Sequence, residues 1–307
     1  MTKHILRSLP LVGFCFCADI GSADLLNQSV QIGDLRAEVS LSPMMQWSTN
    51  VNGGTHAKSF RLAGYTFVAN PDTVAKADLI AGVAAKAIVN LKISPENELT
   101  YVHSRQNLKA VSVGPYEIQK ETRALCLNSR LSQRNIRTCK SSTKSGYHLG
   151  ESEQSDFNVT ASRVHARHIT HVTAGILEKN NANQPYLGFT YTKSISRKPN
   201  HYTQFAMRIG ERVDGVSFDV YKHTLTLSAP IKTFVSNGIK LYTSQTKTEG
   251  ATLLGVDRDT NVLKVGALID KKFARFDVSY GVELENSASS IEGFSYQRFN
   301  YLLNVKF

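Results

Sequence analysis

The last twelve residues of the chain constrain its fold more than any other stretch. They read YQRFNYLLNVKF, and an apolar or aromatic side chain recurs at every second position, namely at Phe299, Tyr301, Leu303, Val305 and Phe307. Polar residues fill most of the positions between them, with Leu302 as the exception. This period of two predicts a β-strand with one apolar face. Soluble proteins usually blunt such an edge, because an exposed apolar strand promotes aggregation.

This alternation continues to the terminal carboxylate and ends on an aromatic residue. In both respects the stretch resembles the closing strand of a bacterial outer-membrane barrel. The resemblance implies that the barrel-assembly machinery reads Phe307 and the alternating residues before it. An ordinary edge strand of a soluble protein is the alternative interpretation, and the rest of the chain has to decide between the two.

Residues 1–23 have the three parts of a secretory signal peptide. Lys3 and Arg7 precede an apolar run, and the small residues at 21–23 provide a cleavage site before Asp24. No later stretch has the 18 or more apolar residues of a membrane-spanning helix. An exported chain of this kind is periplasmic, secreted or a membrane β-barrel.

Period-two alternation recurs along most of the mature sequence. Segments at 35–42, 79–93, 204–210 and 275–285 alternate apolar with polar residues, and some exceed the five or six residues of an average globular strand. After a periplasmic lead-in at 24–33, residues 34–307 are predicted to form an all-β, antiparallel up-and-down transmembrane barrel of about fourteen strands. Counts of twelve or sixteen stay open. The expected strand starts are 34, 79, 98, 116, 135, 155, 170, 186, 202, 216, 233, 262, 274 and 296.

The connections give a second test of the barrel, because outer-membrane barrels have short periplasmic turns and longer external loops. Short periplasmic turns are expected at 94–97, 132–134, 198–201, 229–232 and 271–272. Long external connections are expected at 51–78, 246–261 and 286–295. The apolar phase slips between Val220 and Leu225, which a β-bulge would explain.

The charge of the chain gives little support to a nucleic-acid partner. Its 36 Lys and Arg residues exceed its 25 Asp and Glu residues, which gives a net charge of +11. The basic residues are spread along the strands and do not form a nucleic-acid motif. They suit a polar lumen and rims that face lipopolysaccharide; a solvated surface explains them almost as well. The expected location is therefore the bacterial outer membrane, with its lipids and lipopolysaccharide as partners.

Cys126 and Cys139 are the two cysteines that remain after signal-peptide removal. If a hairpin turns about Ser132 and Gln133, residues whose numbers sum to 265 face each other, and these cysteines meet that condition. Opposed cysteines have the short separation that a disulfide needs, and the periplasm is oxidising. A shift of one residue in register would leave them as unpaired thiols.

No motif in the sequence identifies an enzyme, a cofactor or a metal site. His165, His168 and His171 are the nearest approach to a ligand cluster, but the first two point to opposite faces of a strand unless a turn intervenes. HExxH, GxSxG and Walker-type loops are absent. We therefore expect a non-enzymatic barrel; a hydrolase assembled from neighbouring strands is a second alternative that needs no linear motif.

Several short motifs resemble the barrel domain of the surface lipoprotein assembly modifiers. They are NVNGG at 50–54, RLAGYTF at 61–67, NPDTVAK at 70–76, LGVDRD at 254–259 and SSIEGFSYQR at 289–298. The resemblance implies a fourteen-stranded barrel that helps to move lipoproteins, or secreted clients that capture haem or metal, to the cell surface. Members of that family commonly carry an N-terminal helical repeat domain, and no 34-residue repeat is present here. A diffusion porin, general or substrate-specific, is the alternative function.

The segment 51–78 is the longest expected connection, and its composition is unlike that of a disordered tail. It carries apolar and turn-forming residues that need a partner surface, namely Phe60, Leu62, Tyr65, Phe67, Pro71 and Asp72. Long structureless loops in compact proteins are usually functional or disordered. We expect this segment to be the functional loop, folding back over or into the barrel.

Overall fold

The computed structural model describes residues 27–51, 54–55, 57–69, 74–114, 116–132, 134–147, 150–196, 201–273 and 276–306. The expected signal peptide and Phe307 lie outside these residues. No helix within the described ranges is long and apolar enough to cross a membrane. Almost all of the described chain is antiparallel β-strand.

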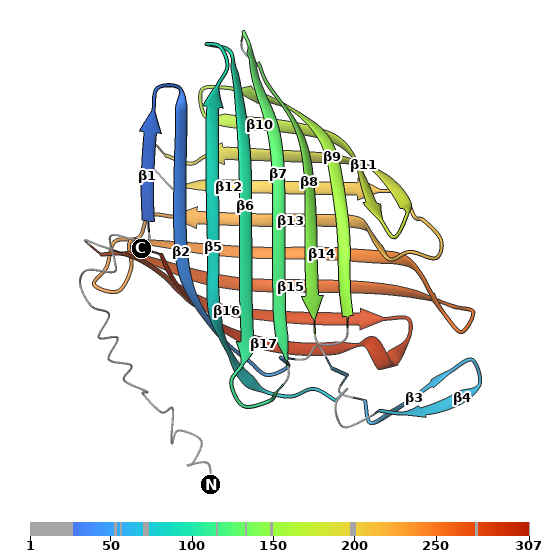
Figure 1. Cartoon of the computed structure of the whole chain (residues 1–307). Coiled ribbons are helices and arrows are strands. Elements are labelled where there is room, and N and C mark those ends of the chain that lie inside the picture. Colours follow the sequence, from blue (N-terminus) through green and yellow to red (C-terminus); the bar gives the residue numbers. More distant parts are fainter. Residues whose placement is uncertain are drawn as a thin grey trace.

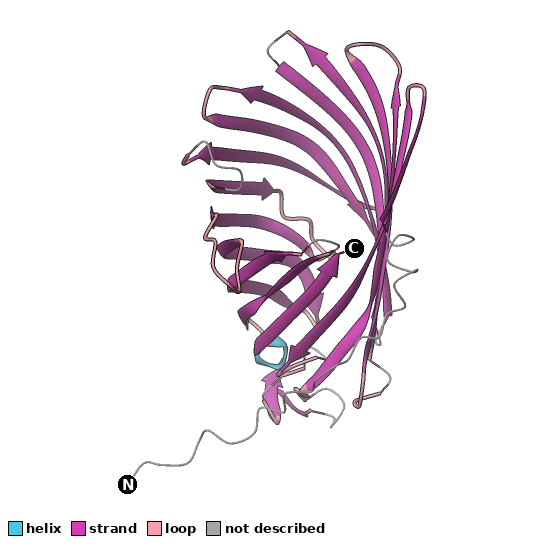
Figure 2. Ribbon diagram, turned by 90° about the vertical axis from the view of Figure 1, so that its left-hand side faces the viewer, coloured by secondary structure: helices cyan, strands magenta, loops and turns pink. Residues whose placement is uncertain are grey.

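Fourteen long strands form a closed barrel, which confirms the predicted fold class and strand count. They are β2 (Leu35–Ser48), β5 (Asp78–Lys92), β6 (Asn97–Ala110), β7 (Glu117–Leu131), β8 (Arg134–Tyr147), β9 (Gly150–Val164), β10 (His168–Lys179), β11 (Ala182–Ser194), β12 (Tyr202–Gly210), β13 (Phe218–Ala229), β14 (Gly238–Leu253), β15 (Val256–Lys272), β16 (Asp277–Ser289) and β17 (Tyr296–Lys306). Each strand pairs with the next one, and β17 pairs with β2 to close the ring. Figure 1 shows the strands of the two opposite walls crossing each other, and Figure 2 shows the sheet curving round on itself. Such crossing is expected of strands that tilt strongly against the barrel axis.

One junction of the barrel differs from the others. The register of β2 with β17 pairs only five residues, from Met44 with Asn304 to Ser48 with Asn300. By comparison, β2 pairs fourteen residues with β5, and β16 pairs eleven with β17. We call the β2–β17 junction the seam.

A short strand, β1 (Asn27–Ile32), occupies the rest of this edge of β2. The sequence had placed these residues in an unstructured lead-in. Instead, β1 and β2 form a hairpin in which Ile32 lies opposite Leu35 and Asn27 opposite Ser40. β2 is thus paired by β1 over its first half and by β17 over its last five residues.

The two faces of the sheet differ as the alternation predicts. Leu225, Val265 and Leu284 lie on the outward face, where they are about half exposed, and register places the last two directly opposite each other. Apolar side chains at exposed positions are stable in contact with the hydrocarbon of a lipid bilayer, so this face suits a membrane. The neighbouring positions point into the lumen and are mostly polar.

On β6–β9 the outward face becomes charged toward the end of the barrel opposite the C-terminus, which we call the loop end. Cross-strand ion pairs cover it: Lys109 lies 3.6 Å from Glu117, and Lys144 lies 3.3 Å from Glu153. Charged side chains destabilise a barrel where they contact the hydrocarbon of the membrane, but not where the strand has left the membrane. We infer that these strands extend past the lipid on that side.

The connections depart from the expected asymmetry. The predicted external loop at 246–261 is wrong, because β14 and β15 fill it and turn through Leu254 and Gly255 alone. Both turn residues have positive φ, 50° and 78°, as the tight hairpin turns of twisted strands require. At the opposite end, the connections at 195–201 and 230–237 are longer than predicted. Only the connection at 49–77 is long at the loop end.

The register shifts in two places. The first shift lies between Asp219 and Tyr221 on β13, which agrees with the bulge that the apolar phase indicated. The second shift lies between Thr248 and Ala251 on β14 and was not predicted. Gly250 has a positive φ of 100° there, and a Cβ on it would lie 2.2 Å from the carbonyl oxygen of Val213. The second bulge therefore brings the β12–β13 connection against β14.

Candidate functional site

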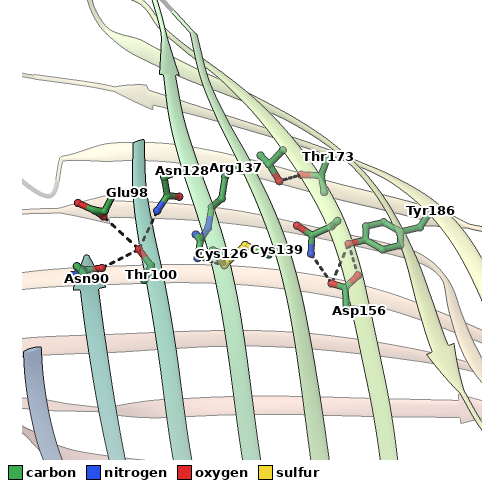
Figure 3. Close-up of a disulfide and its surroundings, with 12 residues drawn as sticks. Asn90, Glu98, Thr100, Cys126, Asn128, Arg137, Cys139, Asp156, Thr173 and Tyr186 are labelled. Atoms are coloured by element: carbon green, nitrogen blue, oxygen red, sulfur yellow. Dashed lines mark hydrogen bonds between the residues drawn. A yellow bond between two sulfur atoms is a disulfide. The ribbon is translucent and has the colours of Figure 1, made fainter. Parts of the chain in front are cut away.

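The inward-facing wall of the barrel is the part of the molecule that can contact a solute. On β5, β6 and β7 it carries a hydrogen-bonded polar layer centred on Thr100 (Figure 3). The Thr100 hydroxyl donates to Asn90 at 2.9 Å and accepts from the Asn128 amide at 3.0 Å. Such a wall offers donors and acceptors to water and to polar solutes.

A disulfide joins Cys126 on β7 to Cys139 on β8 within this wall (Figure 3). The two residues lie directly opposite each other in the register. Both side chains are buried, and the Arg137 guanidinium lies 3.2 Å from the Cys126 sulfur. The disulfide therefore crosslinks the β7–β8 hairpin from the lumen side.

A second polar group links β9, β11 and β12. The Tyr186 hydroxyl donates to Asp156 at 3.0 Å, and the Arg208 guanidinium lies 5.2 Å from the centre of the tyrosine ring. Arg208 also lies 3.5 Å from the carboxylate of Asp219. The ring covers Gly175, its register partner, where a Cβ would come within 2.6 Å of it. Glycine is needed here because the ring fills the space.

A third group forms around two carboxylates on β16. The Glu285 side chain is 2 % exposed and accepts from Arg298 at 2.6 Å and from Tyr296 at 2.7 Å. Lys264 lies 2.8 Å from the same carboxylate. Glu283 accepts from the Tyr242 hydroxyl at 2.6 Å. These carboxylates are already fully partnered, so the group stabilises the wall and leaves little charge for a solute.

The β12–β13 connection, residues 211–217, folds into the lumen. Val213 and Val216 pack against a buried apolar cluster made by Leu177, Tyr186 and Phe218. The connection is held at both ends by hydrogen bonds, one of them from the Gln184 amide to the Glu211 carbonyl at 2.6 Å. Sequence reasoning missed this insert, because seven residues with two valines resemble an ordinary turn.

The expected functional loop, 51–78, divides into two parts. Its base enters the barrel mouth, where Val51 packs against the inward-facing Ile80 and Leu108. The Asn50 side chain is fully buried and makes two hydrogen bonds to the backbone of Gly54, at 2.8 and 2.9 Å. This base narrows the lumen on the β5–β6 side, opposite the insert at 211–217.

The outer part of the loop is a hairpin of β3 (Ser59–Leu62) and β4 (Tyr65–Val68) that projects beyond the barrel (Figure 1). Phe60 stacks on Phe67, and its ring lies where a Cβ on Gly293 would approach within 2.5 Å. Leu62 is buried, whereas Tyr65 is 70 % exposed. Through Phe60 the hairpin docks on the short 3-10 helix η2 (Glu292–Phe294) between β16 and β17. Pro71 and Asp72 lie outside the described residues.

The expected assembly signal lies on the outward face of β17. Phe299 packs edge-on against Tyr301, with ring centres 4.8 Å apart, and Tyr301 also lies 5.6 Å from Trp47 across the seam. Leu303 and Val305 continue the same face toward the C-terminus. The seam is thus sealed on the outside by aromatic contacts. Phe307 lies outside the described residues.

A recess of about 420 Å³ opens into the lumen between β2, β5, β6, β7 and β17. Three lysines line it from three different strands: Lys86 on β5, Lys120 on β7 and Lys306 on β17. All three are exposed to the lumen. This group was not predicted, because its members are far apart along the chain.

The histidines do not assemble a metal site within the described part of the chain. A turn does intervene between β9 and β10, and it stacks the rings of His165 and His168 with centres 4.2 Å apart. His171 instead pairs with the Ser162 hydroxyl at 2.6 Å. Among the described residues, no group of three or more His, Cys, Asp or Glu side chains could hold a metal ion.

Comparison with known proteins places the fold among outer-membrane porins. No protein-family model matches the chain, and no curated protein matches it by sequence. OmpF of Salmonella typhi, solved with daunomycin, superposes with a TM-score of 0.51 over 91 % of this chain and 100 % of that one, at 6 % identity.

Two further solved structures are similar at lower scores. OccAB3 of Acinetobacter baumannii reaches a TM-score of 0.42 at 9 % identity, over 90 % of this chain and 100 % of its own. The outer membrane protein opdK of Pseudomonas aeruginosa reaches 0.43 at 8 % identity, over 88 % and 98 %. At these identities the comparison with OmpF speaks to the fold alone. With its closed barrel and its lipid-facing apolar belt, this protein is a β-barrel of the bacterial outer membrane.

Proposed function

We propose that this protein is a diffusion channel for small polar solutes. The observation that carries the proposal is the inward-facing wall, which is polar and hydrogen-bonded from β5 to β11 and encloses a lumen in a closed barrel. The OmpF-like fold supports the proposal at the level of architecture.

The two inserts set the size limit of the channel. The connection at 211–217 and the loop base around Val51 each bring an apolar cluster into the lumen near the loop end. Apolar constrictions favour dewetting and slow the passage of ions. A polar wall stays hydrated and lets ions pass more readily. We therefore expect a narrow channel whose conductance depends on the insert at 211–217.

Single-channel recording in planar lipid bilayers tests this function. The purified protein should give discrete conductance steps, and replacing Val213 and Val216 together by serine should increase the step size, because the constriction becomes wettable. Val235→Ser is the matched control, since this exposed valine lies in the β13–β14 connection at the other end of the barrel. A folded protein that gives no steps above the bare lipid would refute the channel.

A second function, translocation of a lipoprotein or another secreted client, is favoured by the seam. Only five residue pairs hold β17 to β2, and β1 already satisfies the other half of that edge of β2. Pro43 lies between the two halves and has no N–H to contribute to a ladder. Lateral opening of a barrel costs the least free energy at the junction where the fewest residue pairs have to separate. The resemblance to the surface lipoprotein assembly modifiers points to the same class of client.

Locking the seam tests this second function. Gln46 and Leu302 face each other across it on the lumen side, so a cysteine pair there should crosslink β2 to β17. Thr160 and Thr173, opposed between β9 and β10, provide the control pair away from the seam. Surface display of a co-expressed candidate lipoprotein, measured by protease shaving, should fall with the seam lock and not with the control. Equal display in both strains would rule out translocation through the seam.

A further inference from the structure

We propose that the recess lined by Lys86, Lys120 and Lys306 is a binding subsite for the carboxylate or phosphate group of a small organic anion. The inference rests on the proposed channel function and names its class of solute. The three ammonium groups reach the same recess from β5, β7 and β17, so their charges act together on whatever enters it.

Among the described residues the three lysines have no acidic partner, in contrast to Lys264 on the same lumen face, which lies 2.8 Å from Glu285. Among the described carboxylates, none lies within 4.0 Å of the Lys86, Lys120 or Lys306 ammonium. Even Asp277, which the register places opposite Lys306, is farther away than that. The recess therefore carries three positive charges that the described protein groups do not neutralise.

Neutral hydrogen-bonding residues also line the recess, beside Arg105 and the apolar Met44, Ala84 and Ala85. They are Ser40, Ser42, Ser104, Gln106, Thr122 and Asn304. The side-chain oxygen of Asn304 is buried and has no hydrogen-bond partner among the described residues.

The size and position of the recess fit a transport subsite. Its volume of about 420 Å³ falls within the range of small-molecule pockets, about 300 to 1,000 Å³. It is open to the lumen, and its lysines are exposed, so an anion keeps part of its hydration and is held weakly. Weak binding suits conduction, because a solute must leave the channel as readily as it enters.

The test is the ion selectivity of single channels under a KCl gradient, measured as the reversal potential. The channel should prefer chloride. Lys86→Gln, Lys120→Gln and Lys306→Gln should each lower the chloride-to-potassium permeability ratio about threefold, the effect of one unit charge several ångströms away across water. The triple variant should abolish the preference. Lys222→Gln is the matched control, because this exposed lysine also faces the lumen, on β13, but does not line the recess.

A second measurement identifies the anion chemistry. Succinate and inorganic phosphate, added at one side, should each reduce the chloride current of the parent channel, and the triple variant should lose this block while keeping its conductance steps. A heat-modifiable band on gels establishes that each variant is folded.

The outcomes separate the subsite from the channel. Folded parent protein without conductance steps overturns the channel, and the subsite with it. Conductance with no chloride preference overturns the subsite alone, and so does a shift by Lys222→Gln as large as that by Lys120→Gln. Loss of block in the triple variant but not in the control establishes the subsite.

Discussion

Gly266→Ala should destabilise the barrel more than a Gly→Ala substitution at an open position in a strand would. Gly266 on β15 lies opposite Tyr242 on β14, and the tyrosine ring lies across it. A Cβ on Gly266 would come within 2.3 to 2.5 Å of three atoms of that ring. The ring cannot move away freely, because its hydroxyl donates to Glu283 at 2.6 Å. Aromatic residues that cover strand glycines are a known device of curved sheets.

The magnitude follows from these two contacts. Overpacking of this kind costs about 1 to 3 kcal/mol. If the ring instead rotates to relieve the overpacking, the hydrogen bond to an ionised carboxylate is lost, which costs ~1.5 to 3 kcal/mol in its place. Either way, we expect Gly266→Ala to lower the free energy of unfolding by about 2 to 3 kcal/mol. Gly188→Ala is the control, because its Cβ would meet the Thr173 Cβ at an ordinary 3.4 Å.

Reversible urea unfolding in lipid vesicles, followed by tryptophan fluorescence, measures both effects. The same reasoning predicts the behaviour of a double variant. In a protein that already carries Tyr242→Ala, adding Gly266→Ala should lower the free energy of unfolding by less than about 1 kcal/mol, because the obstructing ring is absent. Equal costs for Gly266→Ala and Gly188→Ala would refute the reasoning, and so would a Gly266→Ala cost that persists without the ring.

Two further predictions test the facing of the strands and the disulfide. Val265→Arg, on the outward face, should cost about 2 to 4 kcal/mol if it lies near the bilayer midplane, whereas Ser244→Arg on the adjacent lumen face should cost little; equal costs would contradict the assigned faces. Reduction of the Cys126–Cys139 disulfide should lower the free energy of unfolding by about 3 kcal/mol, as expected for closure of a short loop. Dithiothreitol should then shift the urea midpoint of the parent and leave a double serine variant unchanged.

Strand positions were predictable because lipid and lumen enforce opposite chemistries on alternate residues. β12 and β17 begin at Tyr202 and Tyr296, as the alternation indicated, and the strand count follows from the same pattern. The opposition of Cys126 and Cys139 followed from one assumption about the hairpin turn. In each case a local rule of period two was enough.

The alternation fails where a strand leaves the lipid. At 246–261 both faces carry polar residues, so the sequence reads as a loop, although the register of β14 and β15 continues to Leu253 and Val256. The same loss of contrast hides β1, whose sequence NQSVQI has only Val30 and Ile32 as apolar residues. Period two marks the membrane-embedded part of a strand and not its full length.

The site was less predictable than the fold, because its parts meet only through the barrel. The insert at 211–217 enters the lumen through two valines that look unremarkable in sequence. Lys86 and Lys306 lie far apart in the sequence, yet they line one recess. Such groups depend on how the barrel closes, which no pattern within one strand reveals.

The recess and the seam share residues, and this links the two proposed functions. Asn304 forms the last residue pair of the seam, with Met44, and Lys306 follows two residues later on the same strand. Separating β17 from β2 would carry Asn304 and Lys306 away from Lys86 and Lys120, and the anion subsite would be lost. A barrel with its seam open cannot keep the chloride preference of the closed one. The cysteine lock between Gln46 and Leu302 should therefore leave the reversal potential unchanged if conduction uses the closed barrel. If the lock changes the selectivity, the conducting state is one in which the seam has opened. In that state the lysines would not share one recess.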